Sequence, residues 1–114
     1  MITTYDWQAA LLAFNTRDYR TAIERLQRVL AEQPGHTDAR EYLARAHYLR
    51  ASLPLAEAEA RTILAADPTN EYITLLLART LERQSRHDEA AGVRRILAAL
   101  TGDDRHATAH TALA

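Results

Sequence analysis

Residues 37–70 read TDAREYLARAHYLRASLPLAEAEARTILAADPTN, and this stretch decides the fold. Its first half places Leu43 and Ala44 on one apolar stripe, and its second half begins another stripe at Ala56. Apolar residues that recur three and four positions apart are typical of amphipathic helices. Pro68 ends the second half, because a residue that lacks an N–H group and has a fixed φ does not continue a helix. The stretch is therefore predicted to form a helical hairpin.

The same pattern recurs upstream and downstream at a shift of 34 positions. Because 23 of the 114 residues are Ala, a column of three alanines carries little weight alone. The prolines weigh more, since two of the three in the chain fall at the same phase, directly after predicted helices. Four columns share one register: Ala10, Ala44 and Ala78; Ala22, Ala56 and Ala90; Val29, Ile63 and Leu97; Pro34, Pro68 and Gly102.

A period of 34 positions with two helices in each period resembles the tetratricopeptide repeat family. That family has a large apolar residue followed by a small one early in the first helix, a small residue early in the second helix, and Pro at the end. The resemblance covers nearly the whole chain. The residues that carry it are Leu43-Ala44, Ala56 and Pro68 in the middle repeat and Leu77-Ala78 and Ala90 in the third.

The resemblance implies an all-α fold. It would be a right-handed α–α superhelix of three tetratricopeptide helical hairpins, with or without a short C-terminal capping helix. The repeats would occupy residues 3–36, 37–70 and 71–104 of a single domain, residues 1–104. Residues 105–114 would form a tail or a partial capping helix.

The composition fits one all-α domain and excludes several classes of protein. Ala and Leu dominate the apolar fraction of 47%, and both are strong helix formers. The 14 basic residues, all of them Arg, face 15 acidic ones, and a net charge of −1 does not support binding to DNA or RNA. The absence of Cys excludes disulfides, thiolate zinc sites and a cysteine nucleophile. No stretch reads as a signal peptide or a membrane span, so we expect a cytoplasmic protein with no membrane partner.

Motifs for catalysis and metal binding are missing from the sequence. A catalytic site needs a nucleophile, acid or base held against an orienting partner, and none of the usual spacings occurs. His47 takes a position that usually holds a large aromatic residue, and we interpret it as a core histidine satisfied by one hydrogen bond. His106 and His110 would share a helix face as two metal ligands do, but no third ligand lies near them in the sequence. We predict no enzyme activity, no metal site and no cofactor.

A stack of hairpins offers a groove, because each repeat adds its first helix to an inner wall. Such a wall can hold an extended or helical segment of another protein. Aromatic residues and Arg dominate the wall positions, and these types are enriched among interface hot spots. We therefore predict a protein-interaction adaptor that binds a partner's peptide in the groove; the other interpretation is that these are ordinary semi-exposed helix residues. The predicted groove residues are Trp7, Leu11, Phe14, Glu41, Arg45, Tyr48, Tyr72, Leu75, Arg79 and Glu82.

The register of the first helix stays open. Without a gap in the period, Trp7, Leu11 and Phe14 point to the concave side, and Asp6 falls where the family prefers Trp. If the turn at Thr16-Arg17 is one residue short, Trp7 and Phe14 become aromatic core residues instead. The ungapped register is favoured, because it keeps an alanine at the tight helix crossing.

One subfamily of tetratricopeptide repeats grips the C-terminal carboxylates of heat-shock chaperones with a clamp of Lys, Asn and Arg. The corresponding positions here hold Trp7, Leu11, Tyr42, Tyr72 and Leu76. The clamp is absent, so an apolar or amphipathic peptide suits the groove better.

The alternative function is self-association without a peptide ligand. Three repeats are near the minimum for a stable stack, and a second copy can cover an exposed end. Arg94 replaces the large apolar residue expected to pack on a following repeat, and we interpret this change as the mark of a terminal repeat that faces solvent. The apolar residues predicted for a homodimer contact are Val93, Ile96, Leu97 and Leu100.

Overall fold

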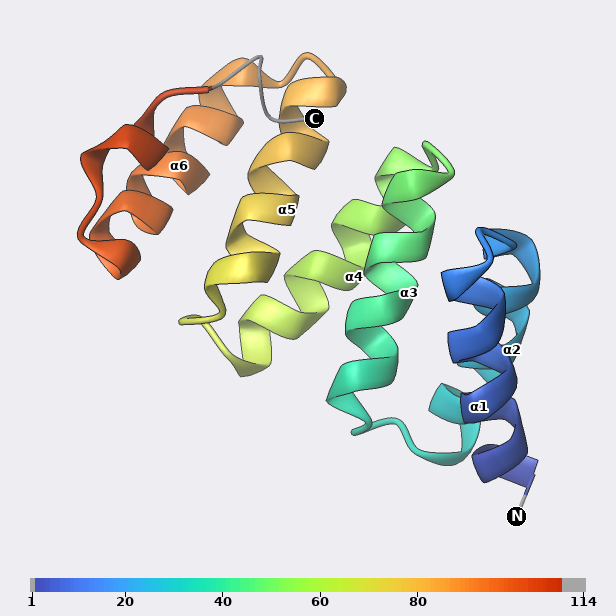
Figure 1. The fold of residues 1–114 in the computed structure, drawn as a ribbon. Helices are drawn as coiled ribbons and strands as arrows, with labels where there is room; N and C mark the ends of the chain where they lie inside the picture. Colours follow the sequence, from blue (N-terminus) through green and yellow to red (C-terminus); the bar gives the residue numbers. More distant parts are fainter. Residues whose placement is uncertain (1, 110–114) are drawn as a thin grey trace. The chain divides into compact units, whose positions relative to one another are not determined.

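The computed structural model describes residues 2–109, with side chains from residue 4 onward, and every regular element in that range is helical (Figure 1). Short turns join consecutive helices, which confirms the all-α fold of helical hairpins expected from the sequence. The elements are α1 (Ile2–Asn15), α2 (Tyr19–Glu32), α3 (Thr37–Leu49), α4 (Leu53–Ala66), α5 (Glu71–Arg83), α6 (His87–Thr101) and the one-turn 3-10 helix η1 (Asp104–Ala107).

The turn inside each hairpin has the same backbone geometry three times. Arg17, Ala51 and Ser85 adopt the left-handed conformation, with φ of 64°, 60° and 60°. These residues are 34 positions apart, so the turn at Thr16-Arg17 is as long as the other two and the first helix keeps the ungapped register. After each of them, a backbone N–H donates to a carbonyl five residues back, which closes the end of the preceding helix. The three bonds are Asp18 N to Ala13 O (2.8 Å), Ser52 N to His47 O (2.8 Å) and Arg86 N to Leu81 O (2.9 Å).

The left-handed turn residues predict a stabilising substitution. Ala51 is exposed and has a φ of 60°, a conformation that is strained for a residue with a Cβ and free of strain for Gly. Ala51→Gly is therefore expected to raise the free energy of unfolding, measured by urea titration, by about 0.5–1 kcal/mol. The matched control is Ala58→Gly in the middle of α4, where the same change is expected to lower it by about 1 kcal/mol. Loss of stability in both variants would contradict the strain argument.

Polar side chains and one glycine fix the ends of several helices. The Asp18 carboxylate accepts a hydrogen bond from the Thr21 N–H (3.2 Å) at the start of α2, and the Asn70 side chain accepts one from the Ile73 N–H (3.0 Å) at the start of α5. These oxygens satisfy N–H groups that have no partner inside the helix. Gly102 ends α6 with a φ of 73°, the left-handed conformation expected at this position.

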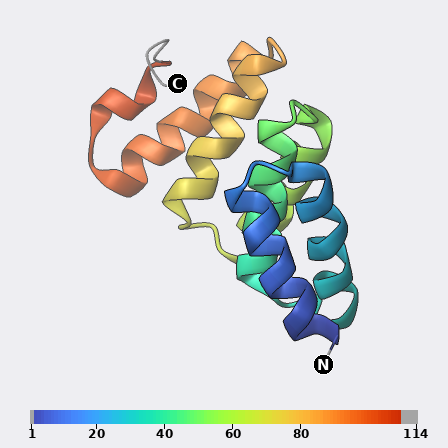
Figure 2. The ribbon, with the colours of Figure 1, turned by 45° about the vertical axis from the view of Figure 1, so that its right-hand side comes forward.

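The described residues form two compact units, the first ending at Glu59 and the second beginning at Ala60. In the first unit α1 and α2 run antiparallel and side by side, as Figures 1 and 2 both show, and α2 also packs against α3. Small alanines lie among larger aliphatic side chains where these helices meet, so the helices approach closely. The core cluster of this unit contains Ala10, Ala13, Phe14, Ala22, Ile23, Leu26, Val29, Leu30, Ala39, Leu43 and Ala46.

Two ion pairs in the first unit join the two helices of a hairpin at equivalent positions of the repeat. In the first hairpin, Asp6 Oδ1 lies 2.8 Å from Arg25 Nη1. In the second, Arg40 Nη1 lies 2.8 Å from Glu59 Oε1. Each residue of the second pair is 34 positions after one of the first, but acid and base are exchanged. Asp6, at the position where the family prefers Trp, is fully buried, so charge replaces apolar packing there.

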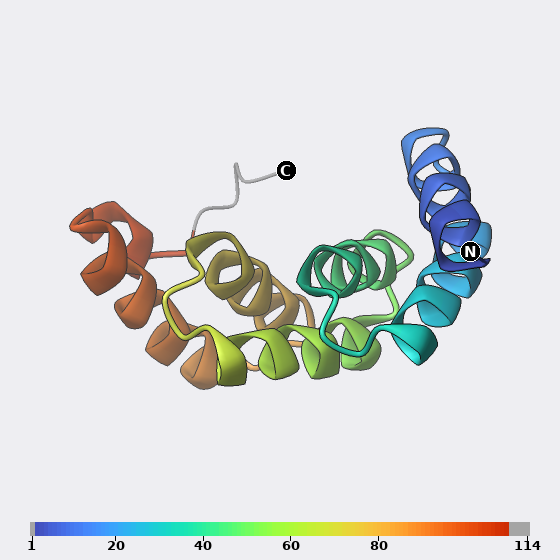
Figure 3. The ribbon, with the colours of Figure 1, turned by 90° about the horizontal axis from the view of Figure 1, so that it is seen from below.

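The second unit contains the end of α4, the antiparallel pair of α5 and α6, and η1 (Figure 3). α5 packs along α6, and η1 lies against α6. Within the described residues, the C-terminal capping helix that the sequence left optional is limited to this single turn. The buried apolar residues of the unit are Ala60, Ile63, Ile73, Leu76, Leu77, Ala78, Leu81, Ala90, Leu97 and Ala98.

The lengths of the helices bear on contact with a membrane. The longest helix between residues 2 and 109 is α6, with 15 residues, whereas a membrane span needs about 20 apolar residues. Over this range, no helix combines the length and the apolar character that crossing a bilayer requires.

Candidate peptide-binding surface

Aromatic side chains of α1 and α3 meet in the first unit. The Tyr42 ring stands edge-on to two rings of α1: its centroid is 5.8 Å from that of Trp7, at 76°, and 5.0 Å from that of Phe14, at 82°. Such contacts are favourable, because the edge of an aromatic ring is positive and its face is negative. We use the name aromatic cluster for Trp7, Phe14, Tyr19, His36, Tyr42 and Arg45.

Arg45 of α3 stacks on this cluster. Its guanidinium carbon lies 4.8 Å from the centroid of the Phe14 ring and 5.0 Å from that of the Tyr42 ring. A cation over ring faces is attracted by their negative quadrupole, and the planar guanidinium can still use its N–H groups as donors. Arg45 is half-buried. Stacking therefore holds the charge in place while part of the side chain stays accessible.

His36 links the aromatic cluster to the start of α3. Its Nδ1 accepts a hydrogen bond from the Ala39 N–H (3.1 Å), and its ring centroid lies 4.6 Å from that of Trp7. A histidine that accepts at Nδ1 carries its proton on Nε2 when neutral. Sequence reasoning missed this role, because His is not among the preferred N-cap residues; its place directly before a predicted helix was the available signal.

Phe14 is a core residue although the register is ungapped. It is buried and belongs to the core cluster, and Tyr42 and Arg45 of α3 close over its ring. Trp7 is half-buried and packs against the same core. Tyr42, which the predicted groove set omits, lies at the centre of the aromatic cluster. Three further predicted groove residues of the first unit are half-buried, and their part in binding stays a prediction: Leu11, Glu41 and Tyr48.

In the second unit, the four predicted groove residues are all exposed or half-buried. Tyr72 is exposed, and Leu75 and Arg79 are half-buried. Glu82 differs, because its carboxylate accepts one hydrogen bond from Arg94 Nε and another, of 3.0 Å, from Arg94 Nη2. A carboxylate held twice by a buried arginine has a structural role, and a part of Glu82 in the binding groove stays a prediction.

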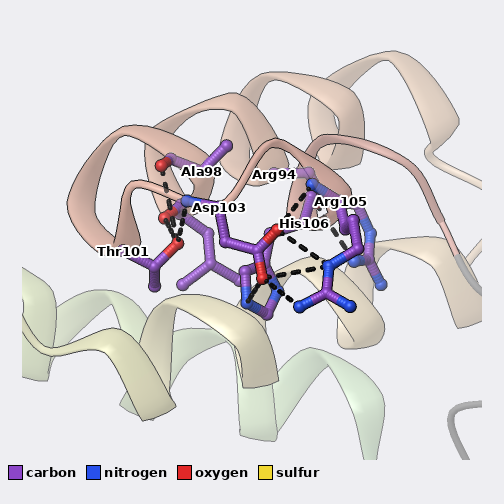
Figure 4. Close-up of polar contacts among 7 residues, drawn as sticks. Arg94, Ala98, Thr101, Asp103, Arg105 and His106 are labelled. Carbon is purple, nitrogen blue, oxygen red and sulfur yellow. Dashed lines mark hydrogen bonds and ion pairs between the residues drawn. The ribbon is translucent and has the colours of Figure 1, made fainter.

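Arg94 does not face solvent: it is 1% exposed. It holds Glu82 of α5 with two donors, and its Nη1 donates to the His106 carbonyl of η1 (3.4 Å; Figure 4). A buried guanidinium needs such partners, because an unpaired charge in the protein interior costs several kcal/mol. The interpretation of Arg94 as a solvent-facing end residue is therefore wrong, and the side chain ties α5, α6 and η1 together.

A small polar network around Asp103 closes the start of η1 (Figure 4). The Asp103 N–H donates to Thr101 Oγ1 (3.2 Å), and the Asp103 carboxylate accepts from the Arg105 N–H (3.0 Å) and from Arg105 Nη2 (2.8 Å). These bonds from Arg105, first from its side chain and then from its backbone, lower the pKa of Asp103 to about 2. The carboxylate therefore stays ionised at physiological pH and keeps the network closed.

The apolar stripe predicted for a homodimer contact on α6 is interrupted. Leu97 is buried, whereas Ile96 is exposed. Val93 and Leu100 are half-buried. Leu97 belongs to the interior of the second unit, so the prediction that it contacts a second copy is wrong, and the four residues do not form one exposed stripe.

His47 is buried, as expected of a core residue, but its Nδ1 has no hydrogen-bond partner among the described residues. Burial lowers the pKa of His47, and the opposing influence of the Glu59 carboxylate is weaker. Glu59 itself pairs with Arg40. A catalytic histidine is normally oriented by a carboxylate that binds it. The carboxylate that acts on the charge of His47 is Glu59, and it forms an ion pair with Arg40.

Stability is expected to fall below about pH 6.5 because of His47. The unfolded chain takes up a proton near the ordinary pKa of 6.5, whereas the folded chain, with its lowered pKa, takes it up only at lower pH. The free energy of unfolding therefore keeps its full value above the pKa of His47 in the unfolded chain. It falls as the pH drops toward the pKa of His47 in the folded chain, by at most about 1.4 kcal/mol per pH unit. Urea titrations at about pH 7.5 and about pH 5.5 should show a smaller loss in His47→Leu than in the wild type.

The control for this pH dependence is His87→Leu, a change at an exposed histidine. It should keep the loss seen in the wild type, because it leaves the buried surroundings of His47 unchanged. Equal pH dependence in the wild type, His47→Leu and His87→Leu would contradict the expectation.

The question of a metal site concerns the C-terminal histidines. Between residues 2 and 109, no three His, Asp or Glu side chains are grouped so that they could hold a metal ion. His106 lies in η1, and its Nε2 is 4.0 Å from Asp103 Oδ2. His110, the other member of the pair, lies outside the described residues, so the expectation of no metal site stays a prediction.

Helical hairpins that recur at a period of 34 positions define the chain as a helical repeat protein. A family model described as tetratricopeptide repeat matches residues 8–71, which is more than half of the chain. The chain belongs to the tetratricopeptide repeat family, whose fold is a protein–protein interaction module.

Solved structures share this fold over most of the chain. The TPR2B-domain:pHsp70 complex of yeast Sti1 matches with a TM-score of 0.77 at 14% identity, covering 94% of this chain and 96% of that one. A structure of MamA (AMB-1) matches with a TM-score of 0.75 at 20% identity, covering 86% of this chain and 63% of that one. At these identities the likeness shows the fold alone. No curated protein matches the chain.

Proposed function

We propose that the chain binds a peptide segment of another protein at the aromatic cluster of its first unit. The observation that carries this proposal is Arg45, which stacks 4.8 Å and 5.0 Å from two aromatic ring centroids while it remains half accessible. Folding alone does not call for a cation at this place, because a partly exposed charge contributes little to stability. Aromatic residues and Arg are the types that carry most of the binding energy in protein interfaces.

The chemistry of the cluster favours an apolar or amphipathic peptide. Trp7 and Tyr42 are half-buried and offer ring surface to an aliphatic or aromatic side chain. The Arg45 guanidinium adds a flat cationic surface beside the rings. Glu41 lies one helical turn before Arg45, in the favourable acid-before-base order. The preferred ligand is therefore an apolar or amphipathic segment with an aliphatic or aromatic anchor.

The comparisons support a protein partner. The Sti1 TPR2B structure is a complex with pHsp70, and the tetratricopeptide repeat family and these fold neighbours are non-catalytic interaction modules. We extend that description to this chain and propose that it has no catalytic activity of its own. A cytoplasmic location is likewise a proposal. Six more residues stay predicted contributors to binding: Leu11 and Tyr48 in the first unit, and Tyr72, Leu75, Arg79 and Glu82 in the second.

Peptides selected against the wild-type chain from a displayed random library test the proposal. Arg45→Ala is expected to weaken the selected peptides by about 1–3 kcal/mol, or roughly 5- to 150-fold in Kd measured by fluorescence polarisation. Circular dichroism verifies that the variant is folded, because Arg45 also packs over the Phe14 ring.

The matched control for this measurement is Arg20→Ala, which removes an exposed arginine of α2 that is absent from the aromatic cluster. It should keep the wild-type affinity. Selected peptides that bind Arg45→Ala as tightly as the wild type would place the binding site elsewhere and contradict the proposal.

A further inference from the structure

α1 carries apolar residues on every side. Asp6 is its only charged residue, and it is buried. One face of α1 packs on α2, and another exposes Tyr5 (64%) and Leu12 (65%), the two most exposed large apolar side chains in the described part of the chain. A helix that is apolar all round is normally covered all round. The face with Tyr5 and Leu12 has no such cover within the described chain.

The equivalent residues of the second hairpin indicate which kind of element packs on this face. The residues 34 positions after Tyr5 and Leu12 are Ala39 and Ala46 of α3, and both are fully buried. α3 packs against α2, and both alanines belong to the core cluster that contains the apolar side chains of α2. The exposed face of α1 is therefore equivalent to the face of α3 that packs against another helix.

The exposed face of α1 is complementary to itself. The midpoint between Gln8 and Ala9 is also the midpoint between Tyr5 and Leu12. A two-fold axis that crosses α1 at this point therefore brings Tyr5 of one copy opposite Leu12 of the other. Ala9 then lies at the crossing, where a small side chain lets two helices approach closely. The exposed residues of α1 carry no charge, so the two copies of α1 do not repel each other.

Tyr5 is already held in position on this face. The guanidinium carbon of Arg25 lies 5.2 Å from the centroid of its ring, and Arg25 is fixed in turn by Asp6 at 2.8 Å. A side chain that is ordered before association loses less conformational freedom when the contact forms.

The C-terminal end of the chain is less suited to receive α1. η1 packs against α6, and Arg94 binds the His106 carbonyl of η1. A contact between α1 of one copy and α6 of the next would also build an open chain of copies, whereas a contact of α1 with α1 closes after two. The occupant that fits the uncovered face is therefore α1 of a second copy.

We propose that two copies of this chain form a two-fold symmetric dimer through α1, with Tyr5 of each copy packed on Leu12 of the other. A helix of 14 residues is about 21 Å long. One such contact buries less than the roughly 1,200 Å² of stable complexes, so the dimer is weak and exchanges rapidly with the monomer. Trp7 and Phe14 lie about half a helical turn away from Tyr5 and Leu12, so the dimer leaves the aromatic cluster free.

Mass in solution at two protein concentrations tests the dimer. At about 1 mM the wild type should approach twice the chain mass of 12.8 kDa, and at about 20 μM it should return to the single mass. Leu12→Glu should stay at the single mass at both concentrations. Leu55→Glu is the matched control, since Leu55 is also a strongly exposed leucine (55%) but lies in α4; it should behave like the wild type.

Three outcomes would overturn the dimer: a wild type that keeps the single mass at the higher concentration, a Leu12→Glu variant that associates like the wild type, or a Leu55→Glu variant that stays monomeric. Circular dichroism verifies that each variant is folded. Arg45→Ala should associate like the wild type, so a failure of peptide binding and a failure of the dimer are distinguishable.

A single introduced cysteine tests the position of the two-fold axis, because the natural chain has no Cys. Ala9→Cys should form an intermolecular disulfide much faster under mild oxidation than Ala58→Cys, which introduces a thiol at an exposed position of α4. Equal rates for the two variants would overturn the proposed pairing. Wild-type protein that stays monomeric but binds a synthetic peptide with the sequence of α2 at this face would assign the face to a helix of another protein.

Discussion

Arg94→Ala is expected to lower the free energy of unfolding by about 3–5 kcal/mol. Arg94 is 1% exposed, and its guanidinium makes two hydrogen bonds to Glu82. Truncation leaves the half-buried Glu82 carboxylate without its cation and empties the space that the long side chain fills. Urea titration followed by circular dichroism measures the loss.

The neighbouring residue supplies a control for Arg94. Arg95 is exposed, and Arg95→Ala is expected to stay within about 0.5 kcal/mol of the wild type. Replacing both partners with leucine, Arg94→Leu with Glu82→Leu, should recover most of the loss, because an apolar pair removes the desolvation penalty of the two charges. If the double variant is as unstable as Arg94→Ala, the unpaired carboxylate is not the source of the effect.

Asp6→Arg is expected to have an effect of similar size. Asp6 is fully buried, with Oδ1 2.8 Å from Arg25 Nη1 and 3.7 Å from Arg28 Nη1. The variant would bring a third guanidinium beside two others, and a buried charge without a partner lowers the free energy of unfolding by about 3–5 kcal/mol. The loss is measured by urea titration.

The second hairpin shows how Asp6→Arg can be rescued. Arg40 and Glu59 form the reversed pair 34 positions further along the chain. Adding Arg25→Glu to Asp6→Arg reproduces that arrangement and is expected to restore most of the lost stability, whereas Arg25→Glu alone should destabilise the chain. A double variant no more stable than Asp6→Arg would show that the two hairpins are not equivalent at these positions.

The sequence was sufficient for the arrangement of helices, because that arrangement depends on features that repeat. The alanine columns and the two prolines predict the period of 34, and the left-handed residues Arg17, Ala51 and Ser85 follow it without a gap. Gly102 ends its helix, and Asn70 begins one, because their backbone and capping preferences suit these positions. These local signals act within one helical turn and can be read without knowing the tertiary contacts.

The buried charges could not be predicted in this way. A periodic pattern treats a charged residue as a surface residue, but Asp6 and Arg94 are buried, because each finds a partner 19 or 12 positions away on the other helix of its hairpin. The same limitation placed Arg94 in solvent. The recurrence of an opposite-charge pair 19 positions apart, once as Asp6 with Arg25 and once as Arg40 with Glu59, was the signal available.

The aromatic cluster was predicted only in part. Trp7, Phe14 and Arg45 were predicted as groove residues, and the sequence did not predict that they meet at Tyr42. The inward orientation of Phe14 depends on Tyr42 and Arg45 of the next hairpin, which pack over it. Whether an aromatic residue on the first helix of a hairpin faces a ligand or a neighbour depends on the side chains of that neighbour. The period alone does not contain this information.

The exchanged polarity of the two hairpin ion pairs also bears on which helices pair while the chain folds. Repeat sequences risk exchange between equivalent helices, because their apolar faces are alike. If α1 paired with α4 in place of α2, Asp6 would meet Glu59, and if α3 paired with α2 in the same way, Arg40 would meet Arg25. Both exchanged pairings bring like charges together, and both correct pairings bring opposite charges together. The two ion pairs therefore favour the pairing of each first helix with the second helix of its own hairpin.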